Sequence, residues 1–182
     1  SKDTQCFKLH SFDFTDASSL AYGTYTNEWK SGDGNSYASK DVLGKRYNTF
    51  GEYDITLITT TINGCKDTMV KHVVIYPSPV DTFLNLTADQ QCFRGNLFSF
   101  INKSKIPSGT ITSWAWNLGN GSLPTSSDVL NYTFLTEDSF FVSLSSTSNL
   151  GCKDTFRKLM VTYAQPVAKY IIPNDSQCWQ KN

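Results

Sequence analysis

The chain repeats itself at a spacing of 86 to 87 residues, and this internal repeat limits the possible folds more than any other feature. The pattern Asp-x-Gln-Cys-aromatic ends at Phe7, at Phe93 and at Trp179. A second pattern, Gly-Cys-Lys-Asp-Thr, begins at Gly64 and at Gly151. A repeat of this length predicts two units of similar fold and the start of a third. We place these units at residues 1–79, 80–166 and 167–182, and we expect the first strand of unit one to be missing.

Alternating apolar and polar residues predict that each unit is built from β-strands. Segments 12–14 (Phe-Asp-Phe) and 98–100 (Phe-Ser-Phe) place two phenylalanines on one strand face. Segments 53–57 and 140–144 alternate in the same way, with apolar residues at every second position. Pro-Val pairs after the last strand of each unit mark the joints. We therefore predict an all-β chain of tandem sandwiches in a linear array.

Each unit also contains a tryptophan that is followed by a Gly-x-Gly turn. We expect both tryptophans to be buried, because a large ring closes a strand against the core. The glycines allow the positive φ angles that a tight turn requires. The predicted core and turn residues are Trp29, Gly32, Gly34, Trp116, Gly119 and Gly121.

The five cysteines fall into two kinds, with one of each kind in each full unit. Zinc sites need closely spaced cysteine pairs, and this spacing is absent from the sequence. We predict one disulfide inside each unit, Cys6 with Cys65 and Cys92 with Cys152. Cys178 would be unpaired, with its partner beyond residue 182. Such bonds indicate an oxidising compartment outside the cytosol.

Composition excludes several classes of partner. The 16 basic residues balance the 16 acidic ones, so the sequence offers no electrostatic basis for binding nucleic acid. No apolar run approaches the roughly 20 residues that span a bilayer. The polar start of the sequence does not resemble a signal peptide, and we interpret the chain as a fragment of a longer exported protein.

Catalysis is not predicted, and neither is a cofactor. The chain has two histidines, His10 and His72, and both lie in unit one. A repeated active site would need repeated residues, whereas Leu159 occupies the position of His72 in unit two. A structural role for His72 in a strand is therefore favoured over that of a general base.

Metal binding was weighed against turn formation. Four aspartates of unit one could converge at one end of a sandwich and bind calcium: Asp13, Asp16, Asp33 and Asp41. Their unit-two counterparts include Ser99, Asn102 and Asn120, and the dense oxygen spacing of an EF-hand loop is missing. Turn formation is the favoured interpretation, and no metal site is predicted.

Sugar binding and glycosylation are two further alternatives. Trp114 lies two residues before Trp116 and should face the same way, so it could stack on a sugar or pack against protein. Its counterpart in unit one is Asn27, and packing is favoured. Several Asn-x-Ser/Thr sequences and the segment 67–69 (Asp-Thr-Met) fit patterns of glycan attachment.

The tryptophan turn and the strand that follows it resemble the PKD domain, an Ig-like β-sandwich. The family pattern is Trp-x-Phe-Gly-Asp-Gly followed by Tyr-x-x-x-Gly-x-Tyr-x-Val-x-Leu. Residues 116–121 carry Leu118 and Asn120 in place of its phenylalanine and aspartate, and residues 29–34 carry Ser31 in place of the phenylalanine. Residues 47–57 match the second half more closely. The resemblance implies tandem PKD-type sandwiches.

The paired cysteine patterns are similar to the tandem repeats of very long surface adhesins of gliding Bacteroidota-type bacteria, which the type 9 pathway secretes. This resemblance implies a non-enzymatic stalk or filament at the cell surface. The implied partners are neighbouring repeats of the same chain, the motility or secretion machinery of the outer membrane, and surface polysaccharide or another extracellular ligand bound through other regions. The alternative is a set of accessory modules in a secreted hydrolase that aid binding of a polysaccharide or protein substrate.

Overall fold

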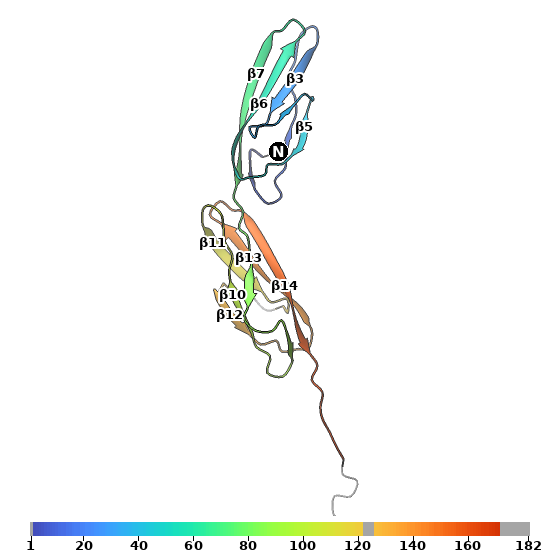
Figure 1. The fold of residues 1–182 in the computed structure, drawn as a ribbon, viewed down its shortest axis with the longest axis vertical. Coiled ribbons are helices and arrows are strands. Elements are labelled where there is room, and N and C mark those ends of the chain that lie inside the picture. Colours follow the sequence, from blue (N-terminus) through green and yellow to red (C-terminus); the bar gives the residue numbers. More distant parts are fainter. Residues whose placement is uncertain (1, 122–125, 172–182) are drawn as a thin grey trace, which may run out of the picture.

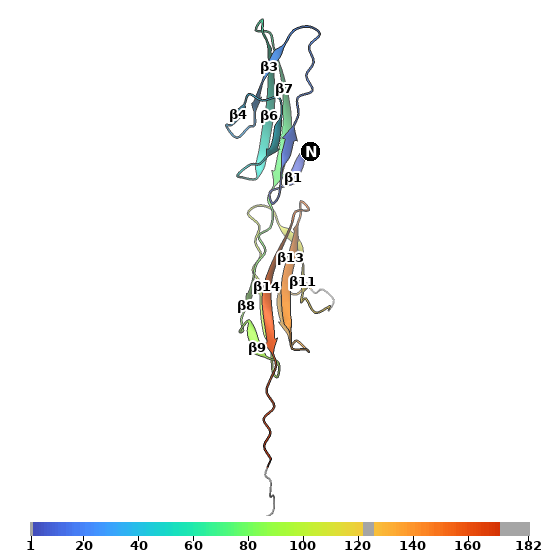
Figure 2. The same cartoon turned by 90° about the vertical axis from the view of Figure 1, so that its right-hand side faces the viewer.

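The computed structural model describes residues 2–121 and 126–171, and in this part of the chain every regular element is a β-strand. The strands form two elongated bodies that lie end to end (Figure 1). We call the body of β1–β7 the first sandwich and the body of β8–β14 the second sandwich. Figure 2 shows the same arrangement from the side. Among the described residues there is no helix that is long and apolar enough to cross a membrane.

The first sandwich pairs a large sheet with a two-stranded one. The large sheet has the order β1-β7-β6-β3-β4, and β2 pairs with β5 opposite it. Strands β1 and β7 run parallel, while the other pairs are antiparallel. The strands are β1 (Thr4–Cys6), β2 (Phe12–Phe14), β3 (Tyr25–Lys30), β4 (Ser36–Tyr37), β5 (Val42–Lys45), β6 (Gly51–Thr61) and β7 (Lys66–Tyr76).

The second sandwich repeats this plan with one strand more in its smaller sheet and one strand fewer in its larger sheet, where β4 has no counterpart among the described residues. Its sheets have the orders β11-β13-β14-β9 and β12-β10-β8, which is the division of strands found in Ig-like sandwiches. The predicted all-β, Ig-like fold is therefore confirmed. The strands are β8 (Phe83–Asn85), β9 (Gln90–Cys92), β10 (Phe98–Asn102), β11 (Ile111–Asn117), β12 (Val129–Tyr132), β13 (Ser139–Ser148) and β14 (Lys153–Tyr163).

Each sandwich has its own hydrophobic core. The alternation in β6 and β13 places Ile55, Leu57, Val142 and Leu144 inside, as predicted. Two stacked phenylalanines of β2, and two of β10, cover the opposite side. The core tryptophans satisfy their ring N–H groups by donating to backbone carbonyls, Trp29 to Lys40 at 3.1 Å and Trp116 to Ser127 at 2.7 Å. All four glycines of the two Gly-x-Gly turns have positive φ angles.

The sandwiches differ at the place of β8. In the second sandwich Phe83 projects from β8 into the core, with its ring 5.6 Å from Phe100, 5.1 Å from Trp116 and 5.3 Å from Phe156. The three counterparts in the first sandwich are Phe14, Trp29 and Met69. In the described chain no strand lies beside β2 where β8 lies beside β10.

Candidate functional site: a disulfide joint and an open groove

The one disulfide among the described residues joins the two sandwiches. Cys6 is bonded to Cys152, with their Cα atoms 5.5 Å apart and 146 positions apart in the sequence. Cys65 and Cys92 are free and exposed. The predicted pairing of Cys6 with Cys65 and of Cys92 with Cys152 is therefore wrong. Cys178 lies outside the described residues.

The length of the last strand explains why the bond cannot close within a sandwich. Cys6 pairs with Tyr76 at the end of β7, whereas Cys65 directly precedes the start of that strand. Eleven residues of strand separate the two cysteines by roughly 36 Å, and a disulfide needs Cα atoms within about 7 Å. Cys92 and Cys152 lie at opposite ends of β14 in the same way. Each sandwich thus carries one cysteine at each of its two long-axis ends, which we call its poles.

A polar network surrounds the disulfide. The Lys8 backbone N–H donates to Ser78 Oγ at 3.0 Å, and the Lys8 ammonium forms an ion pair with Asp154. The second carboxylate oxygen of Asp154 accepts the backbone N–H of Asp81 at 2.9 Å. Asp154, in the second sandwich, therefore binds both the first sandwich and the segment between the two. The Asp154 side chain is 9% exposed and that of Lys8 is 51% exposed, so only the carboxylate half of this ion pair is shielded from solvent.

The segment between the sandwiches is fixed to the second one. Residues 77–79 (Pro-Ser-Pro) are buried, and Val80 exchanges two backbone hydrogen bonds with Lys105, at 2.7 and 3.1 Å. The buried carboxylate of Asp81 accepts the backbone N–H of Ser146 at 2.8 Å and also its hydroxyl. With a disulfide on one side and this anchored segment on the other, the joint is held at two places.

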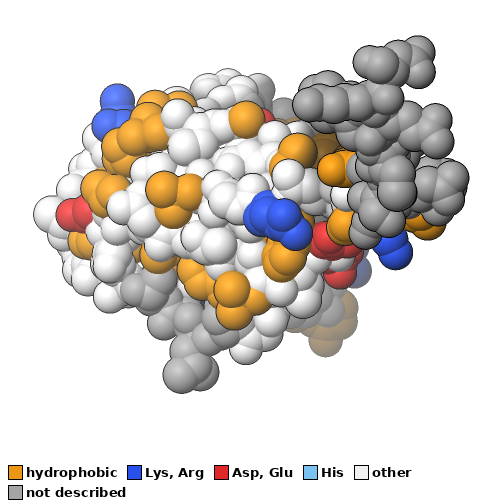
Figure 3. Space-filling view, turned by 90° about the horizontal axis from the view of Figure 1, so that it is seen from below, with side chains coloured by type: hydrophobic (Ala, Val, Ile, Leu, Met, Phe, Trp, Pro, Cys, Tyr) orange, Lys and Arg blue, Asp and Glu red, His pale blue; other side chains and the backbone are white. Residues whose placement is uncertain are grey.

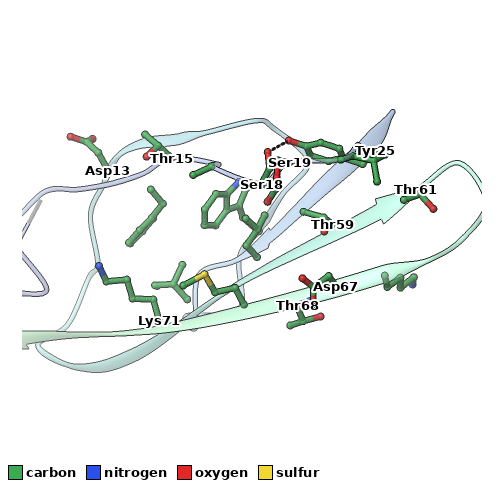
Figure 4. A pocket seen from close by; sticks show the side chains of 18 of the residues that line it. Asp13, Thr15, Ser18, Ser19, Tyr25, Thr59, Thr61, Asp67, Thr68 and Lys71 are labelled. Atoms are coloured by element: carbon green, nitrogen blue, oxygen red, sulfur yellow. Dashed lines mark hydrogen bonds between the residues drawn. The ribbon is translucent and has the colours of Figure 1, made fainter. Parts of the chain in front are cut away.

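The first sandwich contains an open groove where β8 lies in the second sandwich. It is a cavity of about 790 Å³. One wall carries Thr59, Thr61, Asp67 and Thr68, and the segment through Ser18 forms the other (Figure 4). The free Cys65 is among the residues that line the groove. Its apolar floor includes Phe14, Trp29, Ile55, Leu57, Met69 and Val73.

The four aspartates that were weighed as calcium ligands bind protein groups. Asp13 accepts the backbone N–H of Gly44, and Asp41 accepts that of Asp16. Asp16 itself accepts the Asn27 amide at 2.8 Å and the Tyr25 hydroxyl at 3.0 Å. Asp33 lies in its turn against Lys45. Residues 2–121 and 126–171 contain no cluster of three or more side chains suited to a metal ion.

Two carboxylates of the first sandwich have strongly lowered pKa values. Burial alone would raise the pKa of Asp16, but hydrogen bonds led by Ser18 and Asn27 outweigh it and hold this pKa at about 2. Burial likewise opposes ionisation of Asp33, and hydrogen bonds from Lys45, Ser31 and Asn35 lower its pKa well below the ordinary value. The same ion pair, with Nζ and Oδ2 2.6 Å apart, raises the pKa of Lys45 despite its burial.

The histidines and Trp114 have structural surroundings. His10 is buried, with Nδ1 2.7 Å from the Phe7 carbonyl and Nε2 accepting the Tyr47 backbone N–H at 2.7 Å. His72 is exposed on β7, and its pKa is raised mainly by a hydrogen bond to Asp54. Trp114 packs against the second core, with its ring N–H buried. These contacts leave the packing interpretation of Trp114 as the one with structural support.

Sequence reasoning missed the residues that shape the poles. The glutamine of the Asp-x-Gln-Cys pattern closes the next loop, because the Gln5 side chain bonds both backbone groups of Ser11 at 2.8 and 2.9 Å. Gln91 does the same with Leu97 at 3.0 and 2.9 Å. The glutamine recurs in all three copies of the Asp-x-Gln-Cys pattern, and this recurrence is the sequence signal that could have indicated its structural role. Asp154 carried a signal too, since it belongs to the repeated Gly-Cys-Lys-Asp-Thr pattern.

Among known proteins, similarity to this chain is found in solved structures. No protein-family profile and no curated protein matches this chain. The PKD1 domain of Vibrio anguillarum Epp is similar at 25% identity and a TM-score of 0.41, covering 48% of this chain and 96% of that domain. The PKD1 domain of the Vibrio cholerae metalloprotease PrtV is similar at 23% identity and a TM-score of 0.41, covering 47% and 98%.

A third similarity spans both sandwiches. The fibronectin(III)-like modules of Clostridium thermocellum CbhA share 8% identity at a TM-score of 0.39, covering 94% of each chain. All three TM-scores lie below 0.5, so these similarities add no weight to the fold, which the strand order and the two cores define.

Proposed function

We propose that this chain is a non-enzymatic, force-transmitting part of an extracellular stalk built from PKD-type sandwiches, as in a bacterial surface adhesin. The observation that supports this role is the disulfide between the sandwiches. Cys6 lies near one end of the chain and Cys152 near the other, so 145 residues lie between the two ends of the bond. The bond also favours an oxidising location, which agrees with a surface protein.

The position of the disulfide decides how tension would travel. When the chain is pulled at its two ends, force passes from residue 6 through the sulfur atoms to residue 152. The intervening segment, which contains the first sandwich from β2 onward and the second sandwich up to the start of β14, lies outside this path. A stalk with such a bond lengthens far less when a sandwich unfolds than one without it, and this is the property that an extracellular tether needs.

Single-molecule pulling on the 182-residue chain tests this role. In the oxidised protein only the five residues before Cys6 and the thirty after Cys152 can lengthen, to roughly 130 Å at about 3.6 Å per residue. The Cys6→Ser variant should release the whole chain, roughly 650 Å on the same scale. Equal extension of the two proteins would contradict a force-transmitting role.

A glycan array with the oxidised chain tests the alternative of an accessory module. The stalk role predicts no binding to polysaccharide by these two sandwiches. Micromolar binding that is lost in Trp114→Ala would instead favour substrate capture through the exposed edge of β11.

A further inference from the structure

We propose that the two sandwiches dock on each other before any covalent bond joins them, and that this docking brings Cys6 to Cys152. In this scheme Lys8 and Asp154 are positioning residues, because their ion pair aligns the two segments that carry the thiols. The disulfide then locks a joint that noncovalent contacts have already built. The inference rests on the contacts of the joint and holds whether or not the chain serves as a stalk.

The ion pair links the same two short segments as the disulfide. Lys8 follows Cys6 by two residues, and Asp154 follows Cys152 by two residues. The charged pair and the sulfur pair therefore lie side by side across one joint. Opposite charges attract over several ångströms, whereas two thiols interact only at contact. The ion pair can thus act before the sulfur atoms meet.

The hairpin that carries Cys152 is held by contacts that lie entirely within the second sandwich. The Thr110 N–H donates to Asn149 Oδ1 at 3.1 Å, and the Asn149 N–H donates to the Thr110 carbonyl at 2.9 Å. Gly109 allows this close approach, since a Cβ atom there would lie 2.7 Å from Asn149 Oδ1. The Cys152 N–H donates to Ser148 Oγ at 3.1 Å. The second sandwich by itself therefore presents Cys152 at a fixed place.

The first sandwich holds Cys6 and Lys8 in a comparable way. Cys6 pairs with Tyr76 in parallel register, and the N–H of the next residue donates to the Tyr76 carbonyl at 2.8 Å. In the turn that follows, Leu9 has a positive φ angle of 70°, and Gly95 has a φ angle of 79° at the corresponding place in the second sandwich. Leucine is uncommon in this conformation, so the surrounding contacts fix the turn and with it Lys8.

The connection between the two thiols is short once each sandwich has folded. Along the chain, 145 residues lie between the two cysteines. In the fold, Cys6 is held beside Tyr76, while Asp154, near the other cysteine, accepts the Asp81 N–H at 2.9 Å. Residues 77–80 span these two attachment points. A short connector keeps two groups at a high effective concentration, so little further ordering is needed to bring the thiols together.

The segment between the sandwiches also fixes the direction of approach. The buried Asp81 carboxylate accepts the backbone N–H of Ser146 at 2.8 Å and also its hydroxyl. Ser146 is the strand partner of Asp154. On the side of the first sandwich, the Lys8 N–H donates to Ser78 Oγ at 3.0 Å. One network thus joins the first sandwich, the segment and the second sandwich, and it does so without the sulfur atoms.

A concentration of charge is not a general feature of the ends of these sandwiches. Viewed end-on, the opposite pole of the second sandwich mixes apolar and polar side chains with few charges (Figure 3). Lys158 and Asp89 form an ion pair toward that pole, with Nζ and Oδ2 2.6 Å apart, and both side chains are partly exposed. Because this pair lies within one sandwich, it provides a matched control for the pair at the joint.

Formation of the bond is a two-electron oxidation of two thiols. A small-molecule disulfide such as oxidised glutathione serves as the oxidant. The Cys6 thiolate attacks the oxidant and releases one glutathione thiol, and the Cys152 thiolate then displaces the second. The products are one Cys6–Cys152 disulfide and two molecules of reduced glutathione. The two protons lost by the cysteines end on these two thiols.

The test measures the oxidation equilibrium of Cys6 and Cys152 in the full chain carrying Cys65→Ser, Cys92→Ser and Cys178→Ser. The reduced chain is equilibrated with mixtures of reduced and oxidised glutathione, trapped by alkylation and weighed by intact mass spectrometry. We expect the equilibrium constant of the folded chain to exceed that of the urea-unfolded chain by about a hundredfold or more. Equal constants overturn the proposal, because docking then contributes nothing to the pairing.

Variants of the ion pair separate positioning from folding. Lys8→Ala should lower the equilibrium constant about threefold, and Asp154→Asn should lower it by the same factor. The double variant should be no lower than either single one, because both changes remove one interaction. Lys8→Arg should keep the full constant, and Lys158→Ala should leave it unchanged. Additive losses, or an equal loss in Lys158→Ala, overturn the positioning role.

Ionic strength provides a readout that a loss of packing would not move. Because the Lys8 side chain is half exposed, salt screens its attraction to Asp154. Added salt should lower the equilibrium constants of the parent chain and of Lys8→Arg until they match that of Lys8→Ala, which should stay constant. The same salt response in all three chains overturns the proposal that charge aligns the thiols.

Discussion

At the scale of single residues, the two glycines that begin the Gly-x-Gly turns allow a neighbouring strand to approach closely. A Cβ atom on Gly119 would lie 2.7 Å from the Phe141 carbonyl oxygen, and one on Gly32 would lie 2.9 Å from that of Asp54. A Cβ atom on Gly34 or Gly121 would meet nothing within 4 Å. All four residues have positive φ angles, so the members of each turn differ mainly in the space around them.

We expect Gly119→Ala to destabilise the second sandwich far more than Gly121→Ala. Gly121→Ala bears only the cost of a positive φ angle, about 1 to 2 kcal/mol. Gly119→Ala adds a collision with backbone that a small rotation cannot relieve. Urea unfolding of both variants measures the difference. Equal midpoints would show that the turn can move away from β13.

His10 in the first sandwich and Asn96 in the second make equivalent hydrogen bonds to the backbone. Asn96 donates to the Phe93 carbonyl and accepts the Phe134 N–H, as His10 bonds Phe7 and Tyr47. We therefore expect His10→Asn to change the unfolding free energy by less than about 1 kcal/mol. His10→Ala should cost about 2 to 3 kcal/mol, because it leaves two backbone groups without partners. A large loss with asparagine as well would contradict this equivalence when both are compared by thermal unfolding.

At the scale of elements, the Gly-x-Gly turn contacts the strand that follows it through different interactions in the two sandwiches. The turn lies between β3 and β5 in the first sandwich and between β11 and β12 in the second. Asp33 and Lys45 form an ion pair in the first, with side chains 20% and 7% exposed. In the second, Asn120 donates to the hydroxyl of Tyr132 at 2.7 Å at the corresponding positions. Only the first sandwich therefore depends on ionised groups at this place.

We expect the first sandwich to lose stability in acid before the second. The pKa of Asp33 in the folded state lies below its ordinary value of 3.8, so its stabilising contribution is present above that pH and is lost as the pH falls further. The raised pKa of Lys45 has the opposite sign, and its contribution is lost only above about pH 10.5. Amide signals followed by NMR between pH 5 and 2 separate the two sandwiches.

Asp33→Asn provides the control for this acid test. The variant should be less stable at pH 7, because Lys45 remains buried without its counterion. Its further loss of stability below pH 4 should be smaller than that of the unmodified chain. Acid loss of equal size in the two proteins would place the sensitivity elsewhere, for example at Asp16.

At the scale of the whole molecule, the interdomain disulfide links the stability of both sandwiches. A closed loop of this length stabilises the folded state by about 5 kcal/mol in the chain-entropy model. We expect Cys6→Ser to lower the melting temperature and to split one calorimetric transition into two. Lys8→Ala, with the disulfide intact, should have a much smaller effect. A single transition that is unchanged in Cys6→Ser would show that the buried segment between the sandwiches couples them without the bond.

The repeat, the strands and the core were predictable because they depend on local patterns. Alternation in segments 12–14 and 53–57 specifies which face is buried, and the tryptophan turns need glycine at fixed places. The all-β fold and its buried tryptophans follow from residues that act within one strand or turn.

The disulfide was not predictable, because sequence spacing does not tell at which pole of a sandwich a cysteine lies. Cys6 joins β7 at its far end only through parallel pairing with Tyr76, a contact between residues 70 positions apart. The sequence by itself determined that each unit has one cysteine of each kind. Tertiary structure decided that the two kinds lie an entire strand length apart, so that the bond must form between sandwiches.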